Sequence, residues 1–260
     1  MENPMGITGI KGIEGQSMIV TGGASGIGEA AVRLLAANGA LLTIADRGAN
    51  GEALAKELTD AGLRAQFVET DISSEADVMA MVEAAVRSYG RLDGAFNNAG
   101  VPNAGKLLAE LTEEDFRRCH DVNVIGTFLC MKHEILAMLK TGGGAIVNCS
   151  SIHGLIYTAR AAEYTASKHA ITGMTKAAAA DYGLQNIRVN AIAPSSTRTP
   201  MYLHYLKTKP DHEARVNGLH LLGRASEPIE QAQAAMWLLS DAASFVTGVT
   251  LPVDGGYTAV

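Results

Sequence analysis

Short, almost wholly apolar runs alternate with longer amphipathic segments along this chain, and this alternation restricts the fold more than any other feature. The runs with the length and composition of buried strands are 17–21, 41–45, 65–69, 92–97, 145–149, 187–192 and 249–253. Between them, apolar residues recur at helical spacing over 27–38, 51–61, 75–89, 112–139, 163–183 and 228–240. Strands that are apolar throughout are typical of a parallel sheet covered by helices on both faces. The sequence therefore predicts a doubly wound α/β fold of about seven parallel strands.

The chain is predicted to form one domain, residues 1–260. No linker, charge block or repeat divides it, and its 47% hydrophobic residues suffice for a sizeable core. Residues 1–16 lack periodicity and are expected to form a loose lead-in. The stretch 195–225 is also irregular, and a connection of that length within a compact domain is typical of a lid over a substrate site.

Charge and composition argue against several partners and locations. A formal net charge of −6 repels polyphosphate chains, so we expect no nucleic-acid partner. No run approaches the roughly 18 apolar residues that span a bilayer. No basic segment followed by an apolar stretch begins the chain, so neither a membrane nor secretion is expected. Cys119, Cys130 and Cys149 lack C-x-x-C spacing, and we expect reduced thiols of a cytoplasmic protein rather than disulfides or a metal site.

A glycine-rich segment, Thr21–Gly28, joins the first predicted strand to the first predicted helix. Its candidate phosphate-binding residues are Gly22, Ser25, Gly26, Ile27 and Gly28, in a G-x-x-x-G-x-G spacing. Backbone N–H groups of such a turn can approach a pyrophosphate, and the following helix N-terminus carries a partial positive charge. Glycine-rich turns also occur without a ligand, so this turn alone is weak evidence for a cofactor.

Asp46 strengthens the case for a dinucleotide. It ends the second predicted strand, 18 residues after Gly28, where an acidic side chain meets the adenosine ribose. A carboxylate accepts hydrogen bonds from both ribose hydroxyls and repels a 2′-phosphate, so NAD is expected in preference to NADP. The neighbouring Arg47 could soften that repulsion. A turn or cap role for Asp46 is the alternative.

Two further strand ends fit a cofactor site, because ligands of this architecture bind at the carboxyl edge of the sheet. Asp71 and Ile72 close the third strand and could hold the adenine edge. Asn98, Ala99 and Gly100 close the fourth strand and are candidate cofactor contacts. Asparagine here could equally tie neighbouring strands together.

Tyr164 and Lys168 form a Y-x-x-x-K pair within a predicted helix. Spacing i, i+4 places both side chains on one face, one turn apart. A free tyrosine has a pKa of about 10, and a nearby ammonium favours the phenolate. The pair could therefore relay protons near neutral pH. A lysine stem packed beside a half-buried tyrosine is the alternative.

Ser151 and Asn123 are two further polar candidates. Ser151 follows the fifth predicted strand, where its hydroxyl can hydrogen-bond a substrate oxygen or cap a turn. Asn123 lies inside the predicted helix 112–139, where asparagine is unfavourable without a polar reason. That reason could be a water bridge toward Lys168 or a local distortion of the helix.

The order of these residues along the chain resembles the short-chain dehydrogenase/reductase family. The resemblance is carried by Thr21–Gly28, Asp46, Asp71, Asn97–Gly100, Asn123, Ser151, Tyr164 and Lys168, and it extends over about residues 15–258. It implies a single NAD(P)-binding Rossmann domain and hydride transfer between the nicotinamide and a secondary alcohol or ketone. It also implies Tyr164 as general acid/base, Lys168 as the group that tunes Tyr164 and holds the nicotinamide ribose, Ser151 as the group that orients the substrate oxygen, and Asn123 as the anchor of a relay water.

The resemblance continues after the sixth strand, with one departure. Pro194, Thr197 and Thr199 are implied cofactor contacts, and Thr199 matches the family's threonine at the nicotinamide carboxamide. Ser195 stands where the family has glycine. If that position required a positive φ, serine would be strained by about 1 kcal/mol or more, and the loop would differ in shape.

The substrate is less constrained than the reaction. An apolar and aromatic set in the predicted lid favours a small hydrophobic or cyclic substrate, or else packs the lid onto the body: Met201, Tyr202, Leu203, Tyr205 and Leu206. His153 is either a pocket wall or a hydrogen-bond partner for the second hydroxyl of a diol. Segments 92–98 and 226–248 are similar to those of bacterial dehydrogenases that oxidise cyclic diols.

Two other functions remain open at this point. One is a catalytically silent nucleotide-binding regulator, against which the intact Tyr164 set argues; the other is an epimerase or dehydratase that uses NAD internally. Segments 112–139 and 163–183 carry more apolar positions than one sheet face needs, which predicts a subunit contact or a thicker monomer core. The family resemblance implies a homotetramer.

Overall fold

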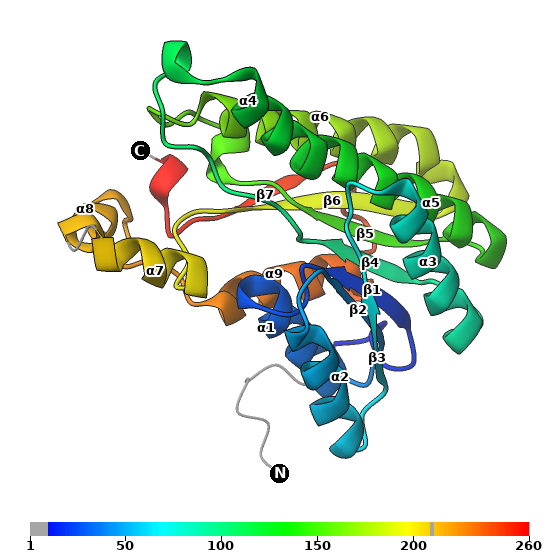
Figure 1. Ribbon diagram of the computed structural model, residues 1–260. Helices are drawn as coiled ribbons and strands as arrows, with labels where there is room; N and C mark the ends of the chain where they lie inside the picture. The colour runs from blue at the N-terminus through cyan, green and yellow to red at the C-terminus, as the bar shows by residue number, and fades with distance from the viewer. Residues whose placement is uncertain (1–9, 209–210, 260) are drawn as a thin grey trace.

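A seven-stranded sheet forms the middle layer of the computed structural model, which describes residues 10–208 and 211–259 (Figure 1). The strands are β1 (Ser17–Thr21), β2 (Leu41–Asp46), β3 (Ala65–Glu69), β4 (Gly94–Asn97), β5 (Gly144–Cys149), β6 (Ile187–Pro194) and β7 (Thr250–Val253). Their order is β3-β2-β1-β4-β5-β6-β7, and every neighbouring pair is parallel. The predicted doubly wound Rossmann-type fold is confirmed, and most predicted strand bounds lie within two residues of those observed.

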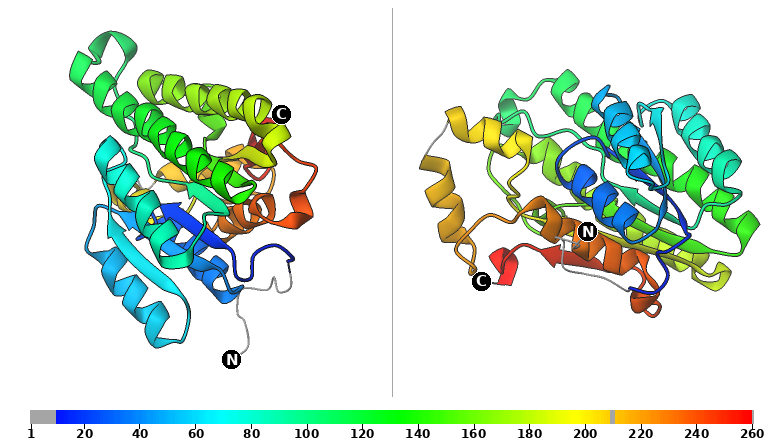
Figure 2. Two further views of the ribbon diagram at one scale, coloured as in Figure 1. Left: turned by 90° about the vertical axis from the view of Figure 1, so that its right-hand side faces the viewer. Right: turned by 90° about the horizontal axis from the view of Figure 1, so that it is seen from below.

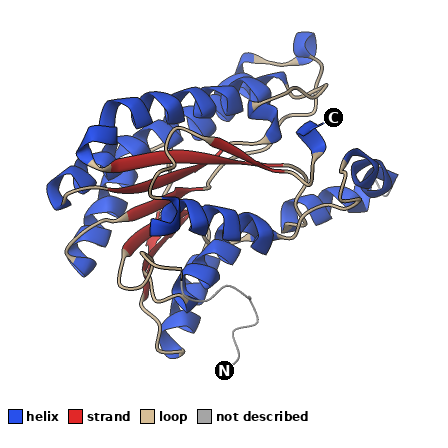
Figure 3. Cartoon of the chain, turned by 180° about the vertical axis from the view of Figure 1, so that it is seen from behind, coloured by secondary structure: helices blue, strands red, loops and turns tan. Residues whose placement is uncertain are grey.

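Helices cover both faces of the sheet, as the view from behind also shows (Figure 3). One face is covered by α1 (Gly26–Ala37), α2 (Asn50–Asp60) and α9 (Pro228–Leu239). The other is covered by α3 (Glu75–Tyr89), α4 (Glu113–His120), α5 (Thr127–Thr141) and α6 (Ala162–Tyr182). The chain's own caps start two of these helices, because Ser74 and Thr112 accept hydrogen bonds from the backbone N–H of Asp77 and Asp115.

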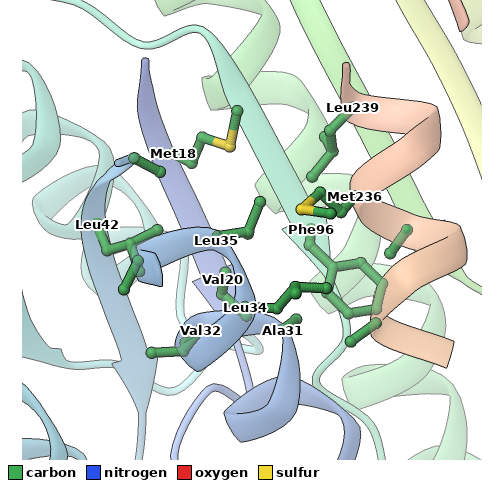
Figure 4. Close-up of a cluster of buried hydrophobic side chains, with 14 of the residues drawn as sticks. Met18, Val20, Ala31, Val32, Leu34, Leu35, Leu42, Phe96, Met236 and Leu239 are labelled. Atoms are coloured by element: carbon green, nitrogen blue, oxygen red, sulfur yellow. The ribbon is translucent and has the colours of Figure 1, made fainter. Parts of the chain in front are cut away.

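The core between the sheet and the first helical layer is filled by aliphatic side chains around one aromatic ring. Phe96 of β4 lies beside Met236 of α9, close to Leu34 of α1, and is fully buried (Figure 4). Full burial of such a side chain contributes about 1.5–3 kcal/mol. Because α1 and α9 pack together on this face of the sheet, the start of α1 and the glycine turn before it are held in a fixed position.

The predicted helix 112–139 is observed as one helical stretch, Glu113–Thr141, with a local distortion inside it. A π-helical segment, Asp121–Gly126, separates α4 from α5, and Asn123 lies within it. Of the two explanations for this asparagine, the local distortion of the helix is therefore observed. By length and composition alone, Glu113–Thr141 could cross a membrane, yet polar residues such as Asn123 and Lys132 interrupt it, so it holds no unbroken run of about 18 apolar residues. Its most apolar window is 56% buried inside the protein, as in the core helix of a soluble fold.

Two segments predicted as irregular are partly ordered. Residues 1–9 of the predicted lead-in lie outside the described residues, but Ile13 is fully buried and Gly15 donates a backbone hydrogen bond to Gly39. The predicted lid 195–225 contains two helices, α7 (Pro200–Thr208) and α8 (Asp211–Leu219). They extend beyond the edge of the sheet in Figure 2. The expectation that 195–225 is irregular is therefore wrong over these two helices, because the segment carries no long apolar period that would predict them, and its role as a lid stays a prediction.

Candidate active site

The turn between β1 and α1 brings backbone atoms too close together for side chains. A Cβ on Gly28 would lie 2.0 Å from the carbonyl oxygen of Gly22, and Gly26 has a φ of +56°. Ser25 is exposed at the N-cap position of α1, and Ile27 is half-buried beside it. The turn therefore presents backbone N–H groups and the start of a helix, the arrangement that binds phosphate.

Asn98 fastens this turn to the neighbouring strand β4. Its side-chain amide donates to the carbonyl oxygens of Thr21 and Gly22, at 3.2 and 3.1 Å. In return, the Thr21 hydroxyl accepts from the backbone N–H groups of Asn98 and Ala99. The strand-tying role left open for this asparagine is thus observed, and its cofactor contact stays a prediction.

Asp46 lies at the end of β2, directly against the glycine turn. Its Oδ2 accepts from Ala24 N–H at 3.0 Å, and its Oδ1 accepts from the N–H groups of Arg47 and Gly48. These bonds fix an anionic group beside the turn and leave further acceptor positions on both oxygens.

The next strand end carries a second carboxylate. Asp71 accepts from the backbone and hydroxyl of Ser73, which hold the pKa of its carboxyl below the usual range. Arg47 approaches Asp71 at 3.5 Å, so its guanidinium points toward this carboxylate. Ile72 is buried, and its side chain packs where a Cβ on Gly126 would lie. Because the Ile72 side chain is buried in the core, Asp71 is the one of these two predicted cofactor contacts that offers a polar side chain.

Tyr164 and Lys168 lie together on α6, as the i, i+4 spacing predicts. The Lys168 Nζ is 5.4 Å from the centre of the Tyr164 ring, and it donates to the Cys149 carbonyl oxygen at 2.8 Å. Lys168 is 4% exposed, so its ammonium is held at the end of β5 with little access to bulk water. The structure thus places the Lys168 ammonium beside the Tyr164 ring, on the same face of α6.

Ser151 and His153 complete the group around Tyr164. The Ser151 hydroxyl accepts from His153 N–H at 3.2 Å and lies 3.4 Å from the Pro194 carbonyl oxygen. The His153 ring meets the Tyr164 ring edge-on, with centres 5.6 Å apart. Burial, and secondarily the Lys168 ammonium, lower the pKa of His153, so this ring is neutral at neutral pH.

Asn123 is joined to this group through Gly100 and the loop that follows it. Its Oδ1 accepts from Val101 N–H at 2.8 Å, and its Nδ2 donates to the Val101 carbonyl and the Ser167 hydroxyl. A Cβ on Gly100 would lie 3.0 Å from Asn123 Oδ1 and 3.7 Å from Lys168 Nζ. The polar ends of the Asn123 and Lys168 side chains thus both lie close to Gly100.

The segment after β6 reaches back to the glycine turn. A Cβ on Gly26 would lie 3.1 Å from the Thr199 side chain, so Thr199 packs on the turn. The Thr197 hydroxyl is buried and is bonded to Ser226 and to the Ser195 carbonyl. Ser195 is not in the left-handed region, which among described non-glycine residues holds only Arg160 and Asn186, so no backbone strain arises at Ser195.

Sequence reasoning missed Glu163, which precedes Tyr164. It is fully buried, and its Oε1 accepts from Ala104 N–H at 2.6 Å, so it holds the 101–106 loop against α6. Its position in the first turn of a helix is favourable for an acid. An acid in that position is usually exposed, so nothing in the sequence distinguishes this one.

The residues present fit a dinucleotide. Backbone atoms crowd the glycines of the turn, Thr199 packs against it, and the Asp46 carboxylate lies beside it as an acceptor of the kind that a ribose hydroxyl needs. Further along the same edge, a hydroxyl, a phenol and a buried ammonium converge. A doubly wound fold with these two groups at its carboxyl edge defines an oxidoreductase.

Comparisons with known proteins agree with this class. A family model described as Enoyl-(Acyl carrier protein) reductase matches residues 22–258. The 2,5-dichloro-2,5-cyclohexadiene-1,4-diol dehydrogenase of Sphingobium indicum is 50% identical over 249 residues, 95% of this chain and 99% of that protein. The cis-4-hydroxycyclohexanecarboxylate dehydrogenase of Sinomonas cyclohexanicum is 42% identical over 93% of this chain and 96% of its own. The crystal structure of levodione reductase superposes with a TM-score of 0.89 at 33% identity, covering 95% of this chain and 99% of that one.

The chain belongs to the short-chain dehydrogenase/reductase family, whose dehydrogenases use nicotinamide cofactors. The family expectation drawn from the motifs is therefore confirmed.

Proposed function

We propose that this protein interconverts a cyclic secondary alcohol and its ketone with NAD(H), and that Tyr164 is the general acid/base. The observation that carries the proposal is the fixed position of the Lys168 ammonium, 5.4 Å from the Tyr164 ring and anchored on the Cys149 carbonyl. When bound, the nicotinamide supplies the hydride acceptor or donor.

The chain's own residues divide the remaining work. Tyr164 takes the hydroxyl proton of an alcohol, or returns it to a ketone oxygen, while Lys168 stabilises the phenolate. Ser151 orients the same substrate oxygen by a hydrogen bond. Asn123 is fixed through both of its polar side-chain atoms, by hydrogen bonds with the backbone of Val101 and with the Ser167 hydroxyl. In this position it would anchor a relay water near Lys168.

The cyclic substrate class is favoured by the names of two relatives, which act on a cyclohexadiene diol and a hydroxycyclohexane carboxylate. The lid offers exposed apolar side chains that suit a ring, among them Met201, Leu203 and Tyr205. The test is a panel of cyclic and linear secondary alcohols and ketones with both cofactors, followed by the absorbance of reduced nicotinamide. Turnover of cyclic alcohols supports the proposal. A regulator would show no turnover, and an epimerase or dehydratase would change its substrate without net change in the cofactor.

Asp46 is proposed to select NAD over NADP, and its removal should reverse that preference in part. Asp46→Ala should raise KM for NAD by about tenfold, since hydrogen bonds to a charged group contribute about 1.5–3 kcal/mol. It should leave KM for NADP unchanged or lower, because repulsion of the 2′-phosphate is relieved. Steady-state kinetics with the two cofactors measure both effects.

The matched control for this variant is Asp60→Ala, which removes an exposed carboxylate paired with Lys56 at the far end of α2. An equal loss for NAD and NADP in Asp46→Ala would remove the ribose role and leave only the hydrogen bonds from the backbone N–H groups of Ala24, Arg47 and Gly48.

We also propose a cytoplasmic homotetramer in which the α4–α5 region contacts another subunit. Its outward face carries large apolar side chains that are between 41% and 49% exposed: Phe116, Ile125, Phe128, Leu136 and Leu139. Apolar surface of this kind on a core helix is typical of a subunit interface.

Phe128→Glu should convert the assembly to smaller species, because an unpaired charge in a buried interface is strongly unfavourable. Light scattering coupled to size exclusion at micromolar concentration measures the mass. Leu184→Glu, at a fully exposed residue after α6, is the control and should leave the mass unchanged. A monomeric wild-type protein would contradict the proposal.

A further inference from the structure

Ser195 and His220 join the two ends of the lid. Ser195 is the first residue after β6, and His220 is the first residue after α8. The Ser195 hydroxyl lies 2.7 Å from His220 Nε2, and the His220 side chain is almost completely buried. A hydrogen bond between residues 25 positions apart thus closes the base of the segment that carries α7 and α8.

The direction of this bond follows from the other ring nitrogen. His220 Nδ1 lies 2.7 Å from the Val216 carbonyl oxygen, one turn earlier in α8. A carbonyl only accepts, so Nδ1 carries a hydrogen, and in a neutral imidazole Nε2 is then the acceptor. Ser195 therefore donates to His220. Through its other ring nitrogen, His220 donates to the last turn of α8, so the imidazole connects Ser195 to that helix.

The surroundings hold the two partners in place. The Tyr257 ring meets the His220 ring edge-on, with centres 5.5 Å apart. Beside them, Arg198 N–H donates to the Ser226 carbonyl and Ser226 N–H donates to the Ser196 carbonyl. A cavity of about 280 Å³ lies next to the pair, lined by both residues and by 252–256. The base of the lid is thus ordered on either side of the hydrogen bond.

Ser195 also directly follows Pro194, a residue that contacts the proposed catalytic residue Ser151. The carbonyl oxygen of Pro194, which precedes Ser195, is the one that lies 3.4 Å from the Ser151 hydroxyl. A shift of Ser195 would move that carbonyl and the start of the lid together.

We propose that Ser195 and His220 are positioning residues that fix the lid over the substrate cleft, and thereby determine how tightly a substrate ring is bound. The inference rests on the proposed function for the identity of the substrate. Loss of the bond should act on substrate KM rather than on proton transfer, because neither side chain reaches Tyr164 or Lys168 through any hydrogen bond among the described residues. We expect substrate KM to rise about fivefold and kcat to stay within about twofold, the size of effect of one hydrogen bond.

Four single variants separate the bond from the packing around it. Ser195→Ala and Ser195→Gly remove the donor. His220→Asn keeps a donor near Nδ1 for Val216 and removes the acceptor for Ser195, whereas His220→Gln carries a polar group toward the Nε2 position. Asn should therefore reproduce the loss in KM, and Gln should restore part of it. In the double variant Ser195→Ala/His220→Asn, the KM effect should not exceed that of either single change.

A second measurement does not depend on activity. Trypsin can cut the lid helices at Lys207 and Arg215, and loosening of the lid base should speed this cleavage several-fold in the Ser195 and His220→Asn variants. His169→Asn is the matched control, because His169 Nδ1 also bonds a carbonyl four residues earlier but lies exposed on α6. It should change neither KM nor cleavage.

The outcomes are distinct for the two proposals. A wild-type protein without turnover of any cyclic alcohol would refute the proposed function, and the cleavage rates would still test the link. Additive KM effects in the double variant, or cleavage at the wild-type rate in every variant, would overturn the positioning role of Ser195 and His220.

Discussion

Tyr164→Phe is expected to lower kcat by about a thousandfold while the protein still binds NAD. Phenylalanine keeps the ring that packs edge-on against His153 and removes only the hydroxyl. Without it, no group at this position can take or return the proton of the substrate oxygen. Lys168 stays anchored on the Cys149 carbonyl, so the loss reports on the phenol and not on a displaced ammonium.

Two measurements are needed for this variant. Stopped-flow or steady-state absorbance of reduced nicotinamide gives kcat, and calorimetric titration gives NAD affinity. Tyr182→Phe, at the other end of α6, is the control and should retain full activity. If Tyr164→Phe keeps its kcat, the acid/base assignment is wrong. If it loses NAD binding to the same extent, the residue serves cofactor binding instead.

The fold could be predicted because its signals are local and repeated. Each strand of the sheet is an apolar run of four to eight residues, and each crossover helix carries its own period. The i, i+4 pair Tyr164 and Lys168 was predicted to share a face for the same reason, since helix geometry alone decides it.

What the sequence could not predict depends on contacts between distant residues. Asn123 distorts its helix because its side chain bonds the backbone of Val101, 22 residues away, and no local pattern contains that partner. Ser195 raised a question of strain that only its observed backbone conformation answers. The helices α7 and α8 are short and carry no long apolar period, so the sequence pattern did not reveal them. In each case the missing information is tertiary.

Glu134 is a further residue whose state only the structure reveals. It is fully buried on α5, and its Oε2 accepts from the Asn97 amide at 2.9 Å. Its Oε1 and the Asn97 Oδ1 are both buried acceptors without a hydrogen-bond partner among the described residues. A proton on Glu134 turns one of these acceptors into a donor. Burial accordingly raises the pKa of this carboxyl to about 7, against the smaller opposing effect of the Asn97 hydrogen bond.

This raised pKa makes stability depend on pH in a defined direction. Between pH 4.5, the ordinary pKa, and about 7, the folded protein holds a proton that the unfolded chain has released. The free energy of unfolding therefore falls as pH rises through that window, and by its upper end the cost is about 3 kcal/mol. Glu134→Gln resembles the protonated form and carries no such cost. It should match the wild type near about pH 5 and be more stable by up to about 3 kcal/mol near about pH 8.

Urea unfolding at one protein concentration and at both pH values measures this difference, and the fixed concentration keeps any contribution of the proposed assembly constant. Glu83→Gln, an exposed carboxyl on α3, controls for the loss of one charge and should give the same small change at both pH values. A Glu134→Gln variant that is less stable than the wild type at the higher pH would mean that the buried carboxylate is ionised and paired. The Oε1 of Glu134 argues against that result, since this buried oxygen has no hydrogen-bond donor among the described residues to stabilise an anion.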